Sequence, residues 1–556
     1  MQLKDTPLGS SDFGKIIREN RYYVDKTMLV RHILKGQDIT MLCRPRRFGK
    51  TLNMQMLRYF FSKGEDNAHL FEGLAISRDE EAMRHLGKYP VIYLSFKDIK
   101  LSDTGAAIWQ MRTLLENAWR GFDYLSNHDN TQKRYETWMA VLKNPQALPY
   151  TYANCLKELS ELLHEYHQEQ VIILIDEYDT PVHAAWQHGY YDEMVSFMRL
   201  LLGAALKDNN HLKKGVLTGI LRVSKESMFS DLNNFIASTV LDNDVFSDLF
   251  GFKEAEVLEM LRYYGLNGRE MEQLRDWYDG YRFGGHTIYN PWSILNYVFS
   301  LDHALKPYWV NTSQDVLLRK LMFGDRASIK DHIQQLLEGK KLEVQLDEYL
   351  TFQALHGNQR TVWTMLVLAG YLGAENPHGG RFYDVSIPNK EIREGFIDGI
   401  YAWLQTDMET STRQRMLEAL MTGKIKDFEY ELTDFVIRVF SYHDTERRYA
   451  ENFYHAFFLG LLAGLEHRYR LTSNREAGYG RYDICLTPKN PADRGIVIEI
   501  KAPETGTKES IQGALAAAVK QLKAKQYDKA LAAAGVGDIL RLAIAVQGKA
   551  VRVKAV

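Results

Sequence analysis

Gly49, Lys50 and Thr51 form the first group of residues whose types and spacing could do chemistry. They follow a short apolar run at 39–43 and precede a helical pattern at 52–61. Strand, Gly-Lys-Thr turn and helix make the layout of a P-loop, whose backbone N–H groups and helix N-terminus face phosphates. We therefore expect Lys50 to reach the β- and γ-phosphates of ATP and the Thr51 hydroxyl to hold Mg²⁺.

The P-loop pattern departs from its consensus at the first position. Arg44 stands where the motif has glycine and Pro45 follows it, which restricts close backbone approach and removes one N–H donor. Gly-Lys-Thr also occurs as a helix-starting turn with a surface lysine, and this is the structural alternative. Four more residues of this stretch are predicted nucleotide contacts: Arg46, Arg47, Phe48 and Leu52.

Asp176 and Glu177 form a second group, which favours the nucleotide-binding interpretation. The aliphatic run 171–175 before them is typical of a strand buried on both faces of a parallel sheet. Open α/β sheets bind ligands at the carboxyl ends of such strands. We expect Asp176 to hold Mg²⁺ through water and Glu177 to orient or activate the attacking water. An Asp-Glu cap after a buried strand is the alternative for this motif alone, but both motifs in this order predict an ATPase core.

Asp483, Glu499 and Lys501 form a third group, close to the end of the chain. Segment 481–486 alternates like a half-buried strand, and segment 495–503 contains an apolar run typical of a central strand. Because side chains alternate along a strand, Glu499 and Lys501 should project from one face. Asp483 and Glu499 would chelate Mg²⁺, and Lys501 would assist the attacking water or stabilise the developing charge. The alternative is an ordinary charged strand edge, although central charges are costly unless paired or metal-bound.

Further core elements are expected around these groups. Segment 89–96 predicts a core strand followed by a long helical stretch to about 167, and segments 190–206 and 215–220 predict a helix and another sheet strand. A polar residue at the end of such a strand, here Thr218, can sense the γ-phosphate.

Three other positions have alternatives that stay open. Arg222 could neutralise transition-state charge as an arginine finger, or form an ordinary salt bridge. Tyr23 or Val24, before the first strand, could touch the base or only pack on the sheet.

Changes in residue composition and hydrophobic pattern along the chain predict four parts. Aromatic residues with Gly and Pro punctuation at about 250–310 indicate a compact lid, and the following region reads as a helical connector with one strand pair near 342–385. The predicted boundaries are 1–235 for the P-loop core, 236–312 for the helical lid, 313–440 for the mostly helical connector and 441–556 for the last domain.

Composition bounds the class of protein. The 556 residues have 45% hydrophobic and 25% charged residues and a net charge of −2, which is ordinary for a globular protein and excludes a globally basic nucleic-acid binder. Three widely spaced cysteines and the polar N-terminus predict reduced thiols and a cytoplasmic protein with no membrane segment.

Together, the motifs resemble a known combination of domains. Segments 44–51, 176–179, 217–219 and 277–281 resemble the bacterial AAA-ATPase-like family, in which a P-loop ATPase is fused to a C-terminal nuclease-type domain. An Asp on one strand, Glu-x-Lys on the next and a preceding helical glutamate, Glu451, resemble the PD-(D/E)XK nucleases. In that resemblance Glu451 would complete the metal shell, and Gln521 and Tyr527 would fit a helix element of some members.

The fold class expected is α/β, with an AAA-like parallel sheet core, a helical lid and connector, and a C-terminal restriction-endonuclease-like domain. The function expected is ATP binding or hydrolysis coupled to a Mg²⁺-dependent DNA endonuclease, in DNA processing or defence against mobile elements. The alternative is a nucleotide-controlled switch whose nuclease-like domain only docks nucleic acid or a partner. RNA as substrate and a homo-oligomer, which Arg222 acting in trans would need, also stay open.

Overall fold

The computed structural model describes most of the chain. The described residues are 3–222, 235–266, 270–310, 332–347 without 334 and 338, 359–376, 379–396, 399, 410–439, 458, 461–462, 465, 468–473, 476–477, 480–481, 483–503, 510–525, 531–532, 535–547 and 550–556. Two compact units form, one from residues 1–313 and 343–391 and the other from 314–342 and 392–556. The four predicted boundaries stay predictions.

A five-stranded parallel sheet organises the first unit, in the order β2-β3-β4-β1-β5. The aliphatic runs predicted from the sequence form its centre, and β1 and β3 are buried along their whole length. The strands are β1 (Ile39–Cys43), β2 (Val91–Ser95), β3 (Val171–Asp176), β4 (Leu212–Gly219) and β5 (Phe235–Ser238). Pairing of Leu42 with Thr218 and of Ser95 with Asp176 brings the strands' carboxyl ends to one edge.

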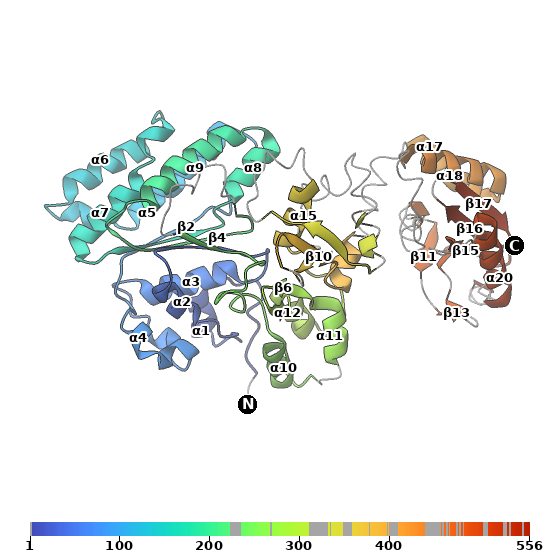
Figure 1. The fold of residues 1–556 in the computed structure, drawn as a ribbon, viewed down its shortest axis with the longest axis horizontal. Coiled ribbons are helices and arrows are strands. Elements are labelled where there is room, and N and C mark those ends of the chain that lie inside the picture. The colour runs from blue at the N-terminus through green and yellow to red at the C-terminus, as the bar shows by residue number, and fades with distance from the viewer. Residues whose placement is uncertain are drawn as a thin grey trace. The chain divides into compact units, whose positions relative to one another are not determined.

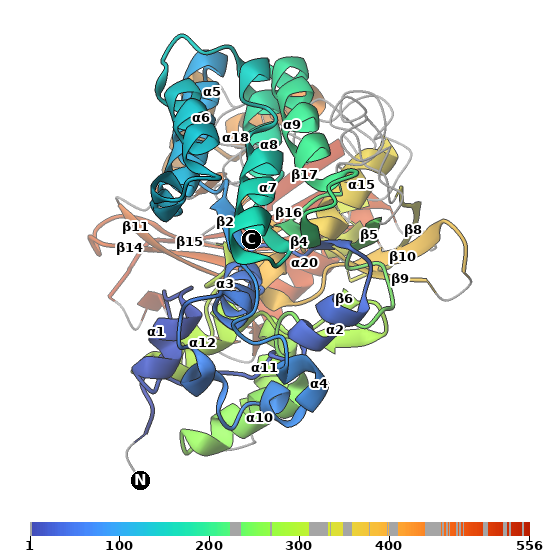
Figure 2. The same cartoon turned by 90° about the vertical axis from the view of Figure 1, so that its left-hand side faces the viewer.

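Helices cover both faces of this sheet (Figures 1 and 2). One layer contains α1 (Phe13–Arg18), α2 (Leu29–Lys35), α3 (Lys50–Phe61) and α4 (Glu80–Met83). The other contains α5 (Thr104–Arg120), α6 (Gln132–Lys143), α7 (Cys155–His167), α8 (Thr180–His188) and α9 (Tyr191–Leu206). Helix α3 begins directly after Gly49, whose φ of 86° is left-handed and therefore suits glycine.

The aromatic region after the sheet forms a small helical layer with a hairpin. Its elements are α10 (Glu254–Tyr263), α11 (Met271–Tyr278), β6 (Tyr281–Phe283), β7 (His286–Ile288) and α12 (Pro291–Phe299). Tyr22 and Val24 pack against its apolar core, so the predicted packing of the N-terminal segment is partly on this layer. Asn290 caps α12 by accepting from the N–H groups of Trp292 and Ser293.

A three-stranded sheet and one helix complete the first unit. The sheet has the order β8-β10-β9, with β8 at Leu342–Gln345, β9 at Gly373–Glu375, β10 at Phe382–Ser386 and helix α15 at Gln359–Leu368. Strand β8 begins at Leu342, the last residue of a segment of the second unit, and continues from Glu343 in the first unit.

The second unit is built on a mixed five-stranded sheet, β11-β14-β15-β16-β17. Strands β15 and β16 are parallel, whereas the other neighbours are antiparallel. The bounds are α17 (Thr410–Thr422), α18 (Ile425–Val439), β11 (Tyr469–Ser473), β12 (Glu476–Ala477), β13 (Gly480–Arg481), β14 (Ile484–Pro488), β15 (Gly495–Lys501), α20 (Ile511–Lys525), β16 (Ile539–Gln547) and β17 (Ala550–Ala555). One sheet face packs on α20, through Val497 and Ala543 against Ala518 and Leu522.

Two smaller predictions concern the whole chain. Cys43, Cys155 and Cys485 are buried and form no disulfide. Within the described ranges, none of the helices has the length and apolar character needed to cross a membrane.

Candidate functional site

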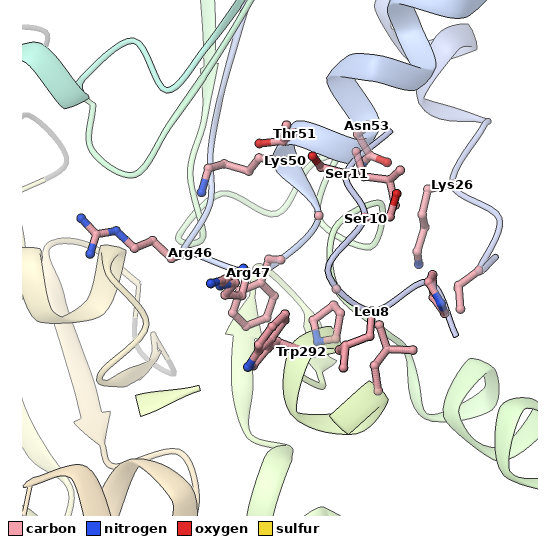
Figure 3. A pocket seen from close by; sticks show the side chains of 18 of the residues that line it. Leu8, Ser10, Ser11, Lys26, Arg46, Arg47, Lys50, Thr51, Asn53 and Trp292 are labelled. Atoms are coloured by element: carbon pink, nitrogen blue, oxygen red, sulfur yellow. The ribbon is translucent and has the colours of Figure 1, made fainter. Parts of the chain in front are cut away.

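A cavity of about 500 Å³ opens at the carboxyl edge of the parallel sheet (Figure 3). The turn before α3, the N-terminal segment and the start of α12 supply its walls. The predicted nucleotide contacts that line it are Arg46, Arg47, Phe48, Gly49, Lys50, Thr51 and Leu52, together with Glu177. A cavity of this size with polar groups at one end suits a nucleotide-sized ligand.

Lys50 is buried at the start of α3, and burial lowers the pKa of its ammonium group. Its Nζ donates to the backbone oxygens of Arg44 and Pro45, at 3.0 and 2.9 Å. The carbonyls of the turn therefore hold the lysine that the sequence predicts to bind phosphates. Arg47 in the same turn has a left-handed φ of 69°, which costs energy in a residue with a Cβ and is typical of functional turns.

Arg44 explains how the turn tolerates a residue other than glycine at its first position. The guanidinium is fully buried and donates to the backbone oxygens of Cys43, Ser238 and Phe246 and to the Ser238 hydroxyl. It also lies over the ring of Phe250, 5.2 Å from the ring centroid. The side chain therefore anchors β5 and the following loop and does not occupy the phosphate side of the turn.

Thr51 and Asp176 meet at the other end of the turn. The Thr51 hydroxyl donates to Asp176 Oδ2 at 2.7 Å, and the Thr218 hydroxyl donates to Asp176 Oδ1 at 2.5 Å. Burial raises the pKa of Asp176, and the two hydroxyl bonds partly offset this shift. Hydroxyl and carboxylate oxygens are the donors that Mg²⁺ prefers, so this pair fits the ion that P-loops hold.

Glu177 lies beside this pair and has a left-handed φ of 54°, so a second non-glycine residue of the site is strained. Its carboxylate accepts from the Thr180 hydroxyl at 3.3 Å. Asp179 holds the opposite loop by accepting from the N–H groups of Ile220 and Leu221, both at 2.9 Å. Two strand-end loops are therefore fixed to each other around Glu177.

The cavity's other end is largely apolar. The Arg47 guanidinium lies 4.2 Å from the centroid of the Trp292 ring, which joins the turn to α12 (Figure 3). Tyr22, Tyr23 and Val24 line the cavity, and Tyr22 and Val24 also pack on the neighbouring layer, so both alternatives for this segment have a structural basis.

Three predicted residues lie outside the cavity wall. Asp176 and Thr218 stand behind Thr51, and Arg222 follows the end of β4; none of the three lines the cavity. Sequence reasoning missed Lys97 and Lys100, which line it. Their signal was their place directly after β2, at the edge where the other strands end.

In the second unit, the sheet register brings the predicted nuclease residues together. Strands β14 and β15 pair Ile484 with Ile498, and one further step of this antiparallel register sets Asp483 opposite Glu499. Asp483 Oδ2 accepts from the backbone N–H of Ile500 at 2.7 Å, which fixes the carboxylate on β15.

Glu499 is fully buried, and Lys501 Nζ lies 3.3 Å from its Oε1. Both project from the sheet face that carries Val497, because residues two apart on a strand share a face. A buried carboxylate beside a half-buried one and a lysine fits a divalent metal, since a buried carboxylate requires positive charge nearby.

Part of the predicted constellation is outside the described ranges. Glu451 and Tyr527 lie there, whereas Gln521 lies on α20 and is partly buried. Within the described ranges, no group of three or more His, Cys, Asp or Glu side chains is arranged to hold a metal. The roles of all these residues stay predictions.

The first unit has the strand, turn and helix layout of a P-loop domain, and the second unit has a mixed five-stranded sheet. Residues 7–229 match the family model described as a predicted AAA-ATPase, and residues 449–556 match that of the PD-(D/E)XK nuclease superfamily. The resemblances inferred from the motifs are therefore confirmed, and the chain carries an AAA-ATPase-like domain and a C-terminal PD-(D/E)XK superfamily domain.

Individual relatives are distant. An uncharacterised protein from the vnfD 5′ region of Azotobacter chroococcum mcd 1 is 27% identical over 333 residues, which cover 59% of this chain and 58% of that protein. A Walker-type ATPase of Pyrococcus abyssi has 13% identity and a TM-score of 0.35, covering 66% of this chain and 94% of its own. A STAND signal-transduction ATPase with a tetratricopeptide repeat sensor from Pyrococcus horikoshii has 12% identity and a TM-score of 0.27, covering 84% of this chain and 55% of its own.

Proposed function

We propose that this protein binds and hydrolyses ATP and couples this to Mg²⁺-dependent cleavage of DNA. The observation that carries the proposal is the presence of two sites in one chain, a cavity around Lys50 and Thr51 and a facing pair of carboxylates, Asp483 and Glu499. The matches to an ATPase-like and a nuclease-superfamily domain support the same two activities.

In the ATPase site, different residues of the cavity would bind the base and the phosphates of ATP. The apolar wall that includes Tyr22, Val24 and Leu295 would take the base, and the cations Arg46, Arg47 and Lys50 would take the phosphates. Thr51 and Asp176 would hold Mg²⁺, which when bound neutralises charge on the phosphates. Glu177 would orient the attacking water, and Thr218 would sense the γ-phosphate.

In the nuclease site, Asp483 and Glu499 would hold Mg²⁺, which when bound polarises the scissile phosphate. Lys501 would position the attacking water or stabilise the developing negative charge. Glu451 would complete the metal shell. The antiparallel register of β14 and β15, continued by one residue to Asp483 and Glu499, supports this assignment of the two carboxylates.

The substrate proposed is DNA in preference to RNA, in DNA processing or defence against mobile elements within the cytoplasm. Nucleotide state would act through the helical lid and connector on access to the nuclease site. A homo-oligomer would be needed if Arg222 serves a neighbouring subunit.

A nucleotide-controlled switch is the second candidate, and one observation favours it. One N–H group of the turn that could face phosphates is absent here, because Pro45 has none. Fewer phosphate donors would slow hydrolysis more than binding, and the nuclease-like domain would then only dock nucleic acid or a partner.

Two variants test the proposal site by site. Lys50→Ala should abolish ATP binding, measured by isothermal titration calorimetry, and leave the unfolding of the second unit unchanged. Glu499→Gln should abolish Mg²⁺- or Mn²⁺-dependent cleavage of plasmid DNA. ATP binding by the wild type without cleavage under any condition would favour the switch.

A further inference from the structure

Glu391 is a buried carboxylate that touches two segments, each of which contacts the P-loop. Its side chain is 0% exposed in the first unit, of which it is the last residue. Oε1 accepts from the backbone N–H of Trp309 at 2.6 Å. The Ser293 hydroxyl donates to both oxygens, at 3.0 and 2.8 Å. Such a fully buried carboxylate is kept only where its bonds hold several segments in place.

The first segment reaches the P-loop through an indole. Trp309 is 1% exposed, and its Nε1–H donates to the backbone oxygen of Arg46 at 3.1 Å. One residue therefore contacts Glu391 with its backbone and the P-loop with its side chain. The ring packs at 5.1 Å from that of Tyr371, which limits its freedom to move without the carboxylate.

The second segment is the first turn of α12. Ser293 follows Trp292, whose ring lies under the Arg47 guanidinium. Glu391 thus reaches Arg46 by one route and Arg47 by the other. These two residues make up the part of the turn with a strained backbone, at φ 69° for Arg47. A strained turn persists only when its surroundings over-determine it.

We propose that Glu391 is a positioning residue of the nucleotide site, which holds the Arg46–Arg47 turn in its phosphate-receiving shape through Trp309 and Ser293. This rests on the proposed ATP binding for its purpose, although the linkage itself can be measured in the protein without nucleotide.

The test is amide hydrogen exchange on the full chain without nucleotide, read in peptides that span 44–52. Wild type is compared with Glu391→Ala, Ser293→Ala and Trp309→Phe, of which the last keeps an aromatic ring but loses the five-membered ring that carries the indole donor to Arg46. Exchange in the P-loop peptides should rise about tenfold in each variant. Matched controls are Trp119→Phe and Ser160→Ala, which alter a fully buried tryptophan and serine remote from the turn; these should leave the P-loop peptides unchanged.

P-loop exchange equal to wild type in Trp309→Phe and Ser293→Ala would overturn the proposal, and so would an equal rise in the controls. A second arm adds Mg-ATP to each protein. Absence of protection in the wild type would contradict the proposed ATP binding, whereas the comparison without nucleotide would still decide the role of Glu391. Mg-ATP should protect the P-loop peptides of the wild type. The apparent ATP affinity read from this protection should be about tenfold lower in Trp309→Phe than in the wild type.

Discussion

Replacing Arg44 by glycine, which restores the P-loop consensus, should destabilise this protein and give no gain in ATP affinity. The Arg44 guanidinium makes four hydrogen bonds, to Cys43, Ser238 twice and Phe246, and none of its surface is exposed. Burial lowers its pKa to about 10, so it remains a cation at neutral pH. Glycine would leave buried acceptors without a donor and open a cavity of side-chain size.

The loss of stability in Arg44→Gly can be estimated from the hydrogen bonds that Arg44 makes. A buried acceptor left without a donor costs about 1–3 kcal/mol, so loss of several such bonds should lower the free energy of unfolding by about 3–5 kcal/mol. A change of this size lowers the melting temperature of a domain of about 200 residues by about 10 °C, and the larger ATPase-bearing unit should shift by roughly 5–10 °C.

Differential scanning calorimetry of Arg44→Gly measures this, with Arg47→Gly as the matched control. The control removes an exposed arginine three positions later, at a left-handed φ of 69° that glycine tolerates. Its stability should therefore change by less than about 1 kcal/mol. An unchanged or higher melting temperature in Arg44→Gly, or tighter ATP binding, would refute the reasoning.

Three more changes have expected outcomes. Burial raises the pKa of Glu391 from 4.5 to about 7. Since the native state then holds a proton that the unfolded state releases, stability relative to Glu391→Gln should fall by roughly 3 kcal/mol as the pH rises from about 4.5 to about 7, measured by urea unfolding. Lys501→Met should destabilise the metal-free second unit by about 3 kcal/mol, because it leaves the buried Glu499 carboxylate without its cation. The double variant with Glu499→Gln should recover most of this loss of stability. A single variant as stable as the wild type would contradict the pairing of Lys501 with Glu499. Gly251→Ala would place a Cβ 2.2 Å from Ile288 at a φ of +78°, so thermal unfolding should show a loss of about 3 kcal/mol, with weaker ATP binding.

The parts of the fold that the sequence predicts are those with local signals. The aliphatic runs of β1 and β3, and the Gly49-Lys50 turn before α3, are read directly from consecutive residues. Strand β5 has four residues and, among the residues that the structure describes, pairs with β1 alone, so a run of this length could not be distinguished from a loop. Helix α8 was likewise not predicted, although Pro181 in its first turn is a helix-start signal.

The parts of the site that were not predicted depend on contacts between distant residues. The role of Arg44 could not be inferred from the sequence, because its partner Ser238 lies 194 residues away. Glu391 and Trp309 are 82 residues apart, and neither belongs to a recognisable motif. Local periodicity contains no information on such pairs, whereas the Glu499 and Lys501 spacing fixes their common face without any tertiary knowledge.

The most direct test of coupled ATP and nuclease sites is cleavage of plasmid and linear single-stranded DNA with Mg²⁺ or Mn²⁺, with and without ATP. Wild type, Lys50→Ala and Glu499→Ala are run side by side. Metal-dependent cutting that is lost in Glu499→Ala, and that responds to ATP in wild type but not in Lys50→Ala, is the predicted result. Cutting that is identical with and without ATP in wild type and in Lys50→Ala would contradict coupling between the two sites.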